Sequence, residues 1–128
     1  MYKRQLYNSF VVLDSVHING SLTQGENTAD IGGIAIAYDA FKLTAQGKGN
    51  EKIDGFTPDQ RFFLSFAQCW RRKIKDQAIL TQINTDPHSP PMYRVWGPLM
   101  SFAPFYAAFN IKEGDKMFVA EKDRINIW

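Results

Sequence analysis

The sequence lacks several features that would by themselves indicate a class of function. One cysteine, Cys69, stands among its 128 residues, so no disulfide can form within the chain and the redox compartment stays open. No apolar run approaches the ~20 residues that a membrane-spanning helix needs. The residues after Met1 lack the apolar segment of a signal peptide, which says nothing about a longer protein. The net charge of +2 is too small to argue for a nucleic-acid partner.

What the sequence does contain is typical of one globular domain rich in aromatic residues. Hydrophobic residues make up 45% and charged residues 22%, and there are ten Phe, five Tyr and three Trp. The densest basic cluster consists of Arg71, Arg72, Lys73 and Lys75. We expect it near the end of a helix, where cations complement the helix dipole, because no glycine-rich or stacking motif accompanies it.

Hydrophobic spacing and turn residues predict one mostly helical unit over 1–128, without repeats or linkers. Helices are expected over residues 3–13, 25–46, 58–73, 76–83 and 103–110. A hairpin is expected with its turn at Asn19-Gly20, and extended segments are expected over 93–100 and 117–119. Thr57, Pro58 and Gln60 predict the start of the third helix, since they fit its N-cap, first turn and capping-box position.

The most informative segment is G-E-N-T-A-D-I-G-G at residues 25–33. Glu26 and Asp30 lie four residues apart at the start of an expected helix, so both carboxylates can point at one spot. The two glycines that follow, Gly32 and Gly33, suggest close helix packing. Taken alone, the two acids could simply be favoured by the dipole of the first helical turn.

A second segment, D-P-H-S-P-P-M-Y-R at residues 86–94, holds a histidine in a loop that its prolines keep irregular. His88 could donate a hydrogen bond to developing negative charge, and Arg94 carries a fixed fork of donors that suits a peptide carbonyl. Taken singly, they could be a surface histidine and an arginine on a strand edge.

Three further residues could serve chemistry but have plainer interpretations. Trp70 could line a pocket or belong to the core, since both have the same composition. Cys69 lies within an expected helix with no histidine nearby in sequence, so a nucleophilic role is disfavoured. A zinc site made from His17, Glu26 and His88 would need three unrelated loops to converge, and we expect His17 near the surface of the hairpin instead.

The segment at 25–33 resembles the second zinc motif of the neprilysin-like zinc metallopeptidases, E-N-x-A-D-x-G-G. The resemblance implies that Glu26 is the third protein ligand of one zinc ion. It also implies that Asp30 orients a zinc-binding histidine on another helix. That helix carries H-E-x-x-H, which is absent from this chain and should lie upstream.

The same resemblance assigns roles to the second segment and to the helix before it. His88 is implied to donate to the oxyanion of the reacting peptide bond, and Arg94 to bind a substrate backbone carbonyl. Cys69 and Trp70 are implied to line the pocket for the side chain after the cleaved bond, although Cys69 stands where Val is familiar. The partners implied are peptide substrates, with no nucleic acid.

The resemblance extends over nearly the whole chain, in order. It includes N-G-x-L-T at 19–23, T-P-D-Q-R-F-F at 57–63, G-P-L at 97–99, F-Y at 105–106, G-D-K-M at 114–117 and the final Trp128. Asn126 and Ile127 stand directly before Trp128, where animal members usually have a Cys close by, so the chain looks like a bacterial, disulfide-free member. Such members are commonly periplasmic, membrane-anchored or extracellular.

The implied fold is mainly α, the C-terminal portion of a zincin (thermolysin-like) catalytic domain with helices, one short hairpin and irregular loops. We expect a fragment of a zinc endopeptidase that hydrolyses peptide bonds with metal-activated water. Alone, it should be inactive, bind zinc weakly, and self-associate through apolar surface that the missing N-terminal part would cover. The alternative is a stand-alone, non-catalytic module that binds peptides. A plain helical interaction domain is disfavoured by the ordered resemblance.

Overall fold

The computed structural model of the chain describes residues 2–127, with side chains from residue 4 onward. Its α-helices are α1 (Tyr2–Asn8), α2 (Gln24–Leu43), α3 (Ala45–Lys48), α4 (Pro58–Cys69), α5 (Asp76–Thr85), α6 (Pro91–Leu99) and α7 (Ala103–Phe109). A two-stranded antiparallel hairpin pairs β1 (Val11–Leu13) with β2 (Val16–His17), and a short 3-10 helix, η1, covers Glu121–Asp123. The expectation of a mainly α fold with one short hairpin is confirmed.

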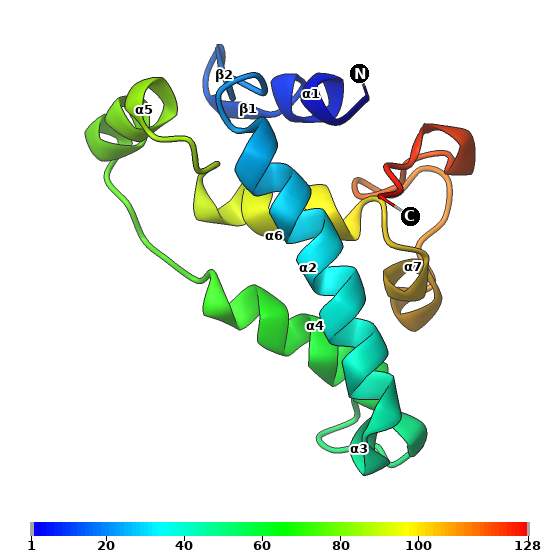
Figure 1. Cartoon of the computed structure of the whole chain (residues 1–128). Coiled ribbons are helices and arrows are strands. Elements are labelled where there is room, and N and C mark those ends of the chain that lie inside the picture. The colour runs from blue at the N-terminus through cyan, green and yellow to red at the C-terminus, as the bar shows by residue number, and fades with distance from the viewer. Residues whose placement is uncertain (1, 128) are drawn as a thin grey trace.

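The long helix α2 organises the molecule. It crosses α6 and also packs against α1 (Figure 1). Helix α4 packs against α7. Gly32 is buried in α2. Gly33 is exposed, and a Cβ there would meet no atom within 4 Å, so close packing does not explain the second glycine. Among residues 2–127, no helix has both the length and the apolar character needed to cross a membrane.

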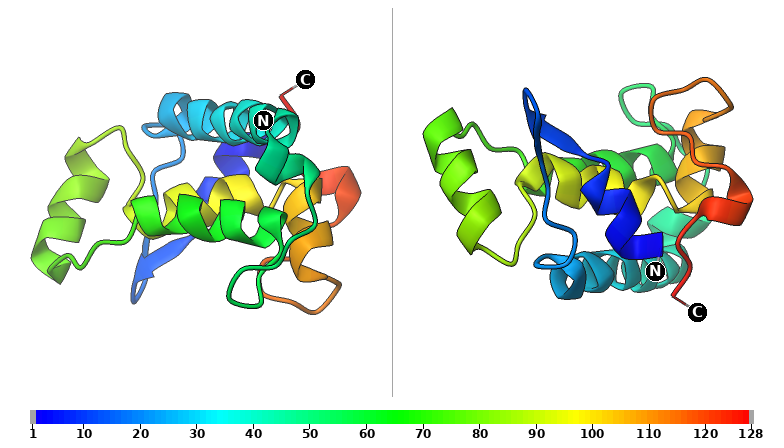
Figure 2. Two further views of the ribbon diagram at one scale, coloured as in Figure 1. Left: turned by 90° about the horizontal axis from the view of Figure 1, so that it is seen from below. Right: turned by 90° about the horizontal axis from the view of Figure 1, so that it is seen from above.

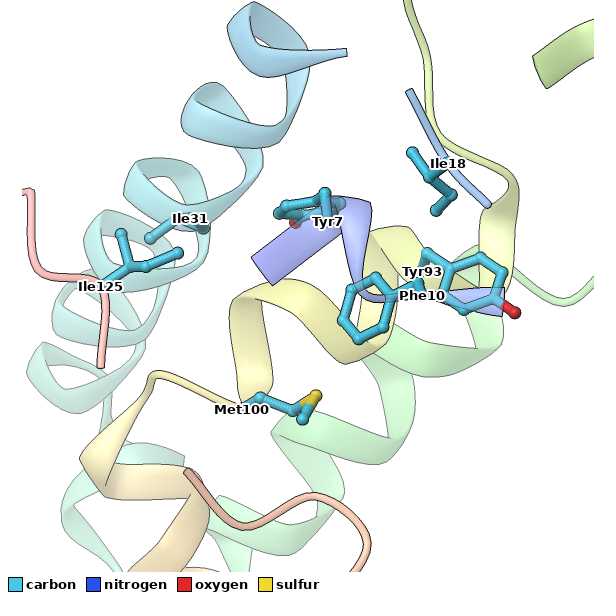
Figure 3. Packing of buried hydrophobic residues seen from close by; sticks show 7 residues of the cluster. All are labelled: Tyr7, Phe10, Ile18, Ile31, Tyr93, Met100 and Ile125. Atoms are coloured by element: carbon cyan, nitrogen blue, oxygen red, sulfur yellow. The ribbon is translucent and has the colours of Figure 1, made fainter. Parts of the chain in front are cut away.

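Two hydrophobic clusters hold the helices together, and α2 contributes to both. The buried members of the first cluster are Tyr7, Phe10, Ile18, Ile31, Tyr93, Met100 and Ile125 (Figure 3). Those of the second are Ile34, Tyr38, Phe63, Leu99, Phe105 and Tyr106. Because α2 places Ile31 in the first cluster and Ile34 in the second, this one helix fixes the two clusters relative to each other.

Helix α4 begins as the sequence predicts but ends earlier. The Thr57 hydroxyl accepts from the backbone N–H of Gln60 at 3.2 Å, and the Gln60 side chain accepts from the Thr57 N–H at 3.0 Å, forming a capping box. The helix ends at Cys69 rather than at residue 73. The basic residues at 71–75 therefore lie just beyond the end of α4, in the irregular segment before α5. They are near a helix end, as expected, but not within the helix.

The first 20 residues differ from the sequence expectation. The helix stops at Asn8 instead of residue 13, and the next residues form β1, since Val, Val and Leu suit a strand. The hairpin turns at Asp14, whose φ is 48°, rather than at Asn19-Gly20. The Asn19 side chain accepts from the N–H groups of Ser21 and Leu22, so this asparagine turns its own backbone toward α2.

The segment expected to be extended over 93–100 is helical instead. Pro91 starts α6, where its fixed φ suits the first helical position and its missing N–H costs nothing. A Gly-Pro pair usually interrupts a helix, yet Pro98 lies in the last turn of α6. The end of α2 also differs, because it stops at Leu43 and the short α3 follows. Residues 117–119 form no strand.

Candidate functional site

The two segments singled out from the sequence meet where the first turns of α2 face α6. Glu26 and Asp30 lie on α2, His88 lies in the loop before α6, and Arg94 lies on α6 itself. His88 Nε2 lies 3.2 Å from Glu26 Oε2, and Arg94 Nη2 lies 3.7 Å from the same oxygen. Residues more than 60 positions apart in the chain thus form one polar cluster.

The centre of this cluster is a two-pronged ion pair between Arg94 and Asp30. Arg94 Nε donates to Asp30 Oδ2 and Arg94 Nη2 to Asp30 Oδ1, each at 2.7 Å. Both side chains are mostly buried, with 15% and 11% exposed. The hydrogen bonds that Arg94 donates to Asp30 hold the pKa of Arg94 above its ordinary value, against the opposing effect of burial. Trp70 covers the guanidinium from one side, since Arg94 Cζ lies 4.1 Å from a ring centroid of the indole.

His88 lies between two carboxylates. Its Nδ1 is 2.7 Å from Asp86 Oδ1, and the same oxygen accepts from the backbone N–H of His88 at 2.9 Å. These two bonds hold the pKa of Asp86 below its usual value. Asp86 therefore fixes one ring nitrogen and leaves the other, Nε2, directed toward Glu26. The sequence assigned no role to Asp86.

Glu26 differs from Asp30 in how its carboxylate is held. Its side chain is 40% exposed, and its contacts with His88 and Arg94 are longer than the two bonds of Asp30. An accessible carboxylate at a helix start fits a single oxygen ligand of zinc. Within residues 2–127, no group of three or more His, Cys, Asp or Glu side chains is placed to hold a metal ion. Among the described residues, the Glu26 carboxylate could therefore serve as one zinc ligand, and a complete zinc site is not formed.

Trp70 connects this cluster to a groove of about 630 Å³ that lies between α4, α6 and the hairpin. Its apolar lining includes Val12, Leu64, Trp70, Met92 and Trp96, and Arg71, Arg72 and Lys73 form a basic wall. Cys69 is exposed and does not line the groove. The structure thus brings Trp70 to Arg94 but leaves Cys69 outside the groove.

His17 is exposed on β2, where its Nδ1 lies 2.8 Å from the Asn8 carbonyl oxygen. It takes no part in the cluster around Glu26.

Several residues near the cluster were missed by the sequence reasoning. Asn27 and Ser89 are each 1% exposed and bond to each other, and each is the neighbour of a residue that the motifs do identify. Tyr7 is fully buried, and burial, followed by the charge of Asp30, raises the pKa of its hydroxyl above its usual range. The only signal for Asn27 and Ser89 was their place inside the two motifs. Nothing marked Tyr7.

Comparison with known proteins supports the same assignment. A family model described as Peptidase family M13 matches residues 3–125. The chain is 43% identical over 114 residues to an endothelin-converting enzyme homolog of Locusta migratoria, covering 87% of this chain and 16% of that protein. It is 38% identical over 128 residues to human endothelin-converting enzyme-like 1, covering 97% of this chain and 16% of the relative.

A solved structure shows the same arrangement of elements. The zinc metalloprotease Zmp1 of Mycobacterium tuberculosis, in complex with an inhibitor, superposes with a TM-score of 0.93 at 34% identity. The match covers 99% of this chain and 20% of that protein. In its open state Zmp1 superposes with a TM-score of 0.92 at 35% identity.

The fold is that of the C-terminal, mainly helical part of a zinc metallopeptidase catalytic domain. More specifically, the chain belongs to peptidase family M13. It spans about 16% of the length of the relatives that it matches.

Proposed function

We propose that this chain is the C-terminal part of the catalytic domain of a zinc-dependent endopeptidase and that Glu26 supplies one of the zinc ligands. The observation that carries the proposal is the different treatment of the two acids of α2. Asp30 is held by Arg94 through both oxygens, whereas Glu26 keeps an accessible carboxylate within 3.2 Å of His88. The first arrangement suits a positioning group and the second suits a ligand.

The other residues of the cluster take roles that match their geometry. Each Asp30 oxygen keeps a second acceptor direction, so the carboxylate can also accept from the N–H of a zinc-binding histidine. His88 donates from Nδ1 to the Asp86 carboxylate, so Nε2 carries a proton when the ring is an imidazolium; in that form it donates a hydrogen bond to the reacting carbonyl as negative charge develops. Arg94 is oriented by Asp30 and Trp70, and its remaining N–H groups donate to a substrate backbone carbonyl. Trp70 lines the adjoining substrate pocket, with Cys69 beside it in sequence.

When bound, zinc would supply a Lewis acid and lower the pKa of a water molecule. The described residues offer one ligand for it, and two imidazoles and a general base from an upstream H-E-x-x-H helix are needed as well. The isolated 128-residue chain should therefore bind zinc weakly and cleave no peptide. We also propose that it self-associates through the apolar groove, which light scattering at increasing concentration would detect.

The zinc role is tested on the full-length protein, expressed from the complete reading frame. Glu26→Ala should lose bound zinc, measured by elemental analysis, and should lower cleavage of a fluorogenic peptide by at least about 100-fold. Removing an outer-shell partner alone costs about 10–100-fold, and a ligand should cost no less. Glu51→Ala, which changes an exposed loop acid, is the matched control and should keep both zinc and activity. Full zinc content and full activity in Glu26→Ala would refute the role of Glu26.

The alternative is a stand-alone module that binds peptides without cleaving them, and the groove beside Trp70 favours it. The reading frame upstream of Met1 separates the two functions, because only the endopeptidase requires H-E-x-x-H there. If that motif is absent, fluorescence titration of the 128-residue chain with peptides should show binding that Trp70→Ala weakens. For the endopeptidase we propose a location at or outside the cell envelope, in line with a relative named membrane metallo-endopeptidase-like 1.

A further inference from the structure

We propose that Asn27 and Ser89 are a pair of positioning residues that sets His88 over Glu26. The proposal rests on the proposed function, because it gives His88 and Glu26 their parts in the reaction. Asn27 directly follows Glu26 on α2, and Ser89 directly follows His88 in the loop. A bond between the two neighbours therefore fixes the separation of the two functional side chains.

The pair belongs to a chain of hydrogen bonds that runs in one direction. The Ser89 hydroxyl donates to Asn27 Oδ1 at 2.7 Å, and Asn27 Nδ2 donates to Thr23 Oγ1 at 2.9 Å. The Thr23 hydroxyl in turn donates to the Asn19 carbonyl at 3.0 Å. Because Thr23 spends its proton on Asn19, its oxygen must accept from Asn27. This fixes which end of the Asn27 amide faces Ser89.

Burial makes the loss of any bond in this chain energetically costly. Thr23 is 2% exposed, and Asn27 and Ser89 are 1% exposed each. Water cannot replace a lost partner in such a place, so each group left unpaired costs about 1–3 kcal/mol. Bonds aligned in one direction also strengthen one another in a buried setting. These buried bonds therefore fix the loop relative to the helix.

The other contacts of His88 do not fix the position of its loop relative to α2. Its bond to Asp86 joins residues two positions apart within the same loop, so it orients the ring but leaves the loop free to move relative to α2. Its contact with Glu26 joins side chains that are 43% and 40% exposed, and exposed ion pairs contribute little. The Gln82 amide donates to the His88 carbonyl at 3.3 Å, which ties the loop to α5. Among the residues that the structure describes, the bond of Ser89 to Asn27 is the one that joins the loop to α2 in a buried place, and Arg94 and Asp30 join α6 to α2 further along.

A positioning role and a merely structural role predict different kinetics. If the pair only supports the fold, Ser89→Ala lowers activity by the same factor whether or not His88 is present. If the pair acts through His88, the loss disappears once His88 has been removed, because no group remains to be misplaced. A misplaced oxyanion donor also lowers kcat and leaves KM largely unchanged.

The experiment is a double-mutant cycle on the full-length protein, with Ser89→Ala, His88→Ala and the double variant. Ser89→Ala alone should lower kcat about 10–100-fold, the range for outer-shell positioning groups, with KM within about twofold. In the His88→Ala background it should change kcat less than twofold. Thr28→Ala is the matched control and should leave kcat unchanged, because the Thr28 hydroxyl donates only to Gln24 of its own helix. A loss from Ser89→Ala that persists without His88 would overturn the proposal.

A second measurement does not depend on activity. Crystal structures of the full-length protein and its Ser89→Ala variant should show the His88 ring displaced from Glu26 by more than about 1 Å, and Thr28→Ala should leave it in place. If Ser89→Ala fails to fold, Thr23→Val breaks the chain of bonds at its far end, and a smaller displacement is expected. An unmoved ring in the variants overturns the positioning role. A wild-type protein without zinc-dependent cleavage overturns the proposed function instead, while the ring position still decides the role of the pair.

Discussion

At the scale of single residues, the site depends on how each charged group is held by its neighbours. Asp30 and Glu26 are the same kind of group on the same helix, yet Arg94 holds one through both oxygens and leaves the other accessible. Asp86 is the third acid of the site, and it accepts two hydrogen bonds from a single residue, His88. These two bonds orient the His88 ring.

The low pKa of Asp86 predicts how stability depends on pH. A carboxyl whose pKa is lower in the folded protein contributes stability above its ordinary value of 3.8 and loses it as pH falls through the folded value. Asp86→Asn should therefore destabilise the protein at pH 6, and the difference from wild type should narrow below pH 3.8. Urea unfolding at pH 6, 4 and 3 measures this difference. A gap that stays constant over the whole range would mean that the charge of Asp86 contributes nothing.

At the scale of elements, the contact between α1 and α6 depends on a glycine. A Cβ on Gly97 of α6 would lie 2.0 Å from the hydroxyl oxygen of Tyr7, a residue that is fully buried between the helices. The hydroxyl has no hydrogen-bond partner among the side chains and backbone that the structure describes. Gly97 thus provides the space in which the Tyr7 ring fits, three residues beyond Arg94.

Two glycine substitutions should consequently change the free energy of unfolding in opposite directions. Gly97→Ala should destabilise the protein by about 1–3 kcal/mol or more, because buried atoms on both helices must move. Gly33→Ala on α2 meets no atom within 4 Å and should stabilise it by up to ~1 kcal/mol, through the better helix propensity of alanine. Urea unfolding followed by circular dichroism compares the two variants with wild type. Equal effects of the same sign would contradict the packing argument for Gly97.

The elements also show what could be predicted from sequence. The start of α4 was predictable because Thr57 and Gln60 satisfy each other within one helical turn. Helix α6 was not, since Gly97-Pro98 is read locally as a break, whereas the burial of Gly97 against Tyr7 is decided by a residue 90 positions away. The turn of the hairpin was expected at Asn19-Gly20 but lies at Asp14. The Asn19 side chain accepts instead from the backbone N–H groups of Ser21 and Leu22, so Asn19-Gly20 does not form a tight connection between two strands.

At the scale of the whole molecule, the site is assembled from segments that are far apart in the chain. The motifs could single out Glu26, Asp30, His88 and Arg94 as candidates because all four lie in two short runs of sequence. They could not reveal that Arg94 pairs with Asp30, or that Ser89 bonds to Asn27 across 62 positions. Such pairings follow from the crossing of α2 and α6, which Figure 1 shows.

The arrangement of elements predicts that stability is uneven, with α5 the helix that opens most easily. It stands at one end of the molecule between the irregular segments 71–75 and 86–90 (Figures 1 and 2). Ile83 is its one buried residue among those that the structure describes, whereas α2 buries five. Helices with little buried apolar surface open with a small free energy, so the backbone amides of α5 should exchange with solvent much faster than those of α2.

Hydrogen exchange followed by NMR or mass spectrometry tests this ranking, with α4 as the control. Helix α4 is similar in length to α5 but has a capping box and the buried Phe63, so its amides should exchange slowly. Because Ser89 is bonded to α2, opening of α5 should leave the His88 loop in place, and the His88 amide, which donates to Asp86, should exchange more slowly than the amides of 78–83. If α5 proves as protected as α2, contacts with the rest of the chain must hold it more firmly than its single buried side chain indicates. In that case α5 would not open separately from α2, and there would be no motion of α5 against which the bond of Ser89 to Asn27 has to hold His88 in place.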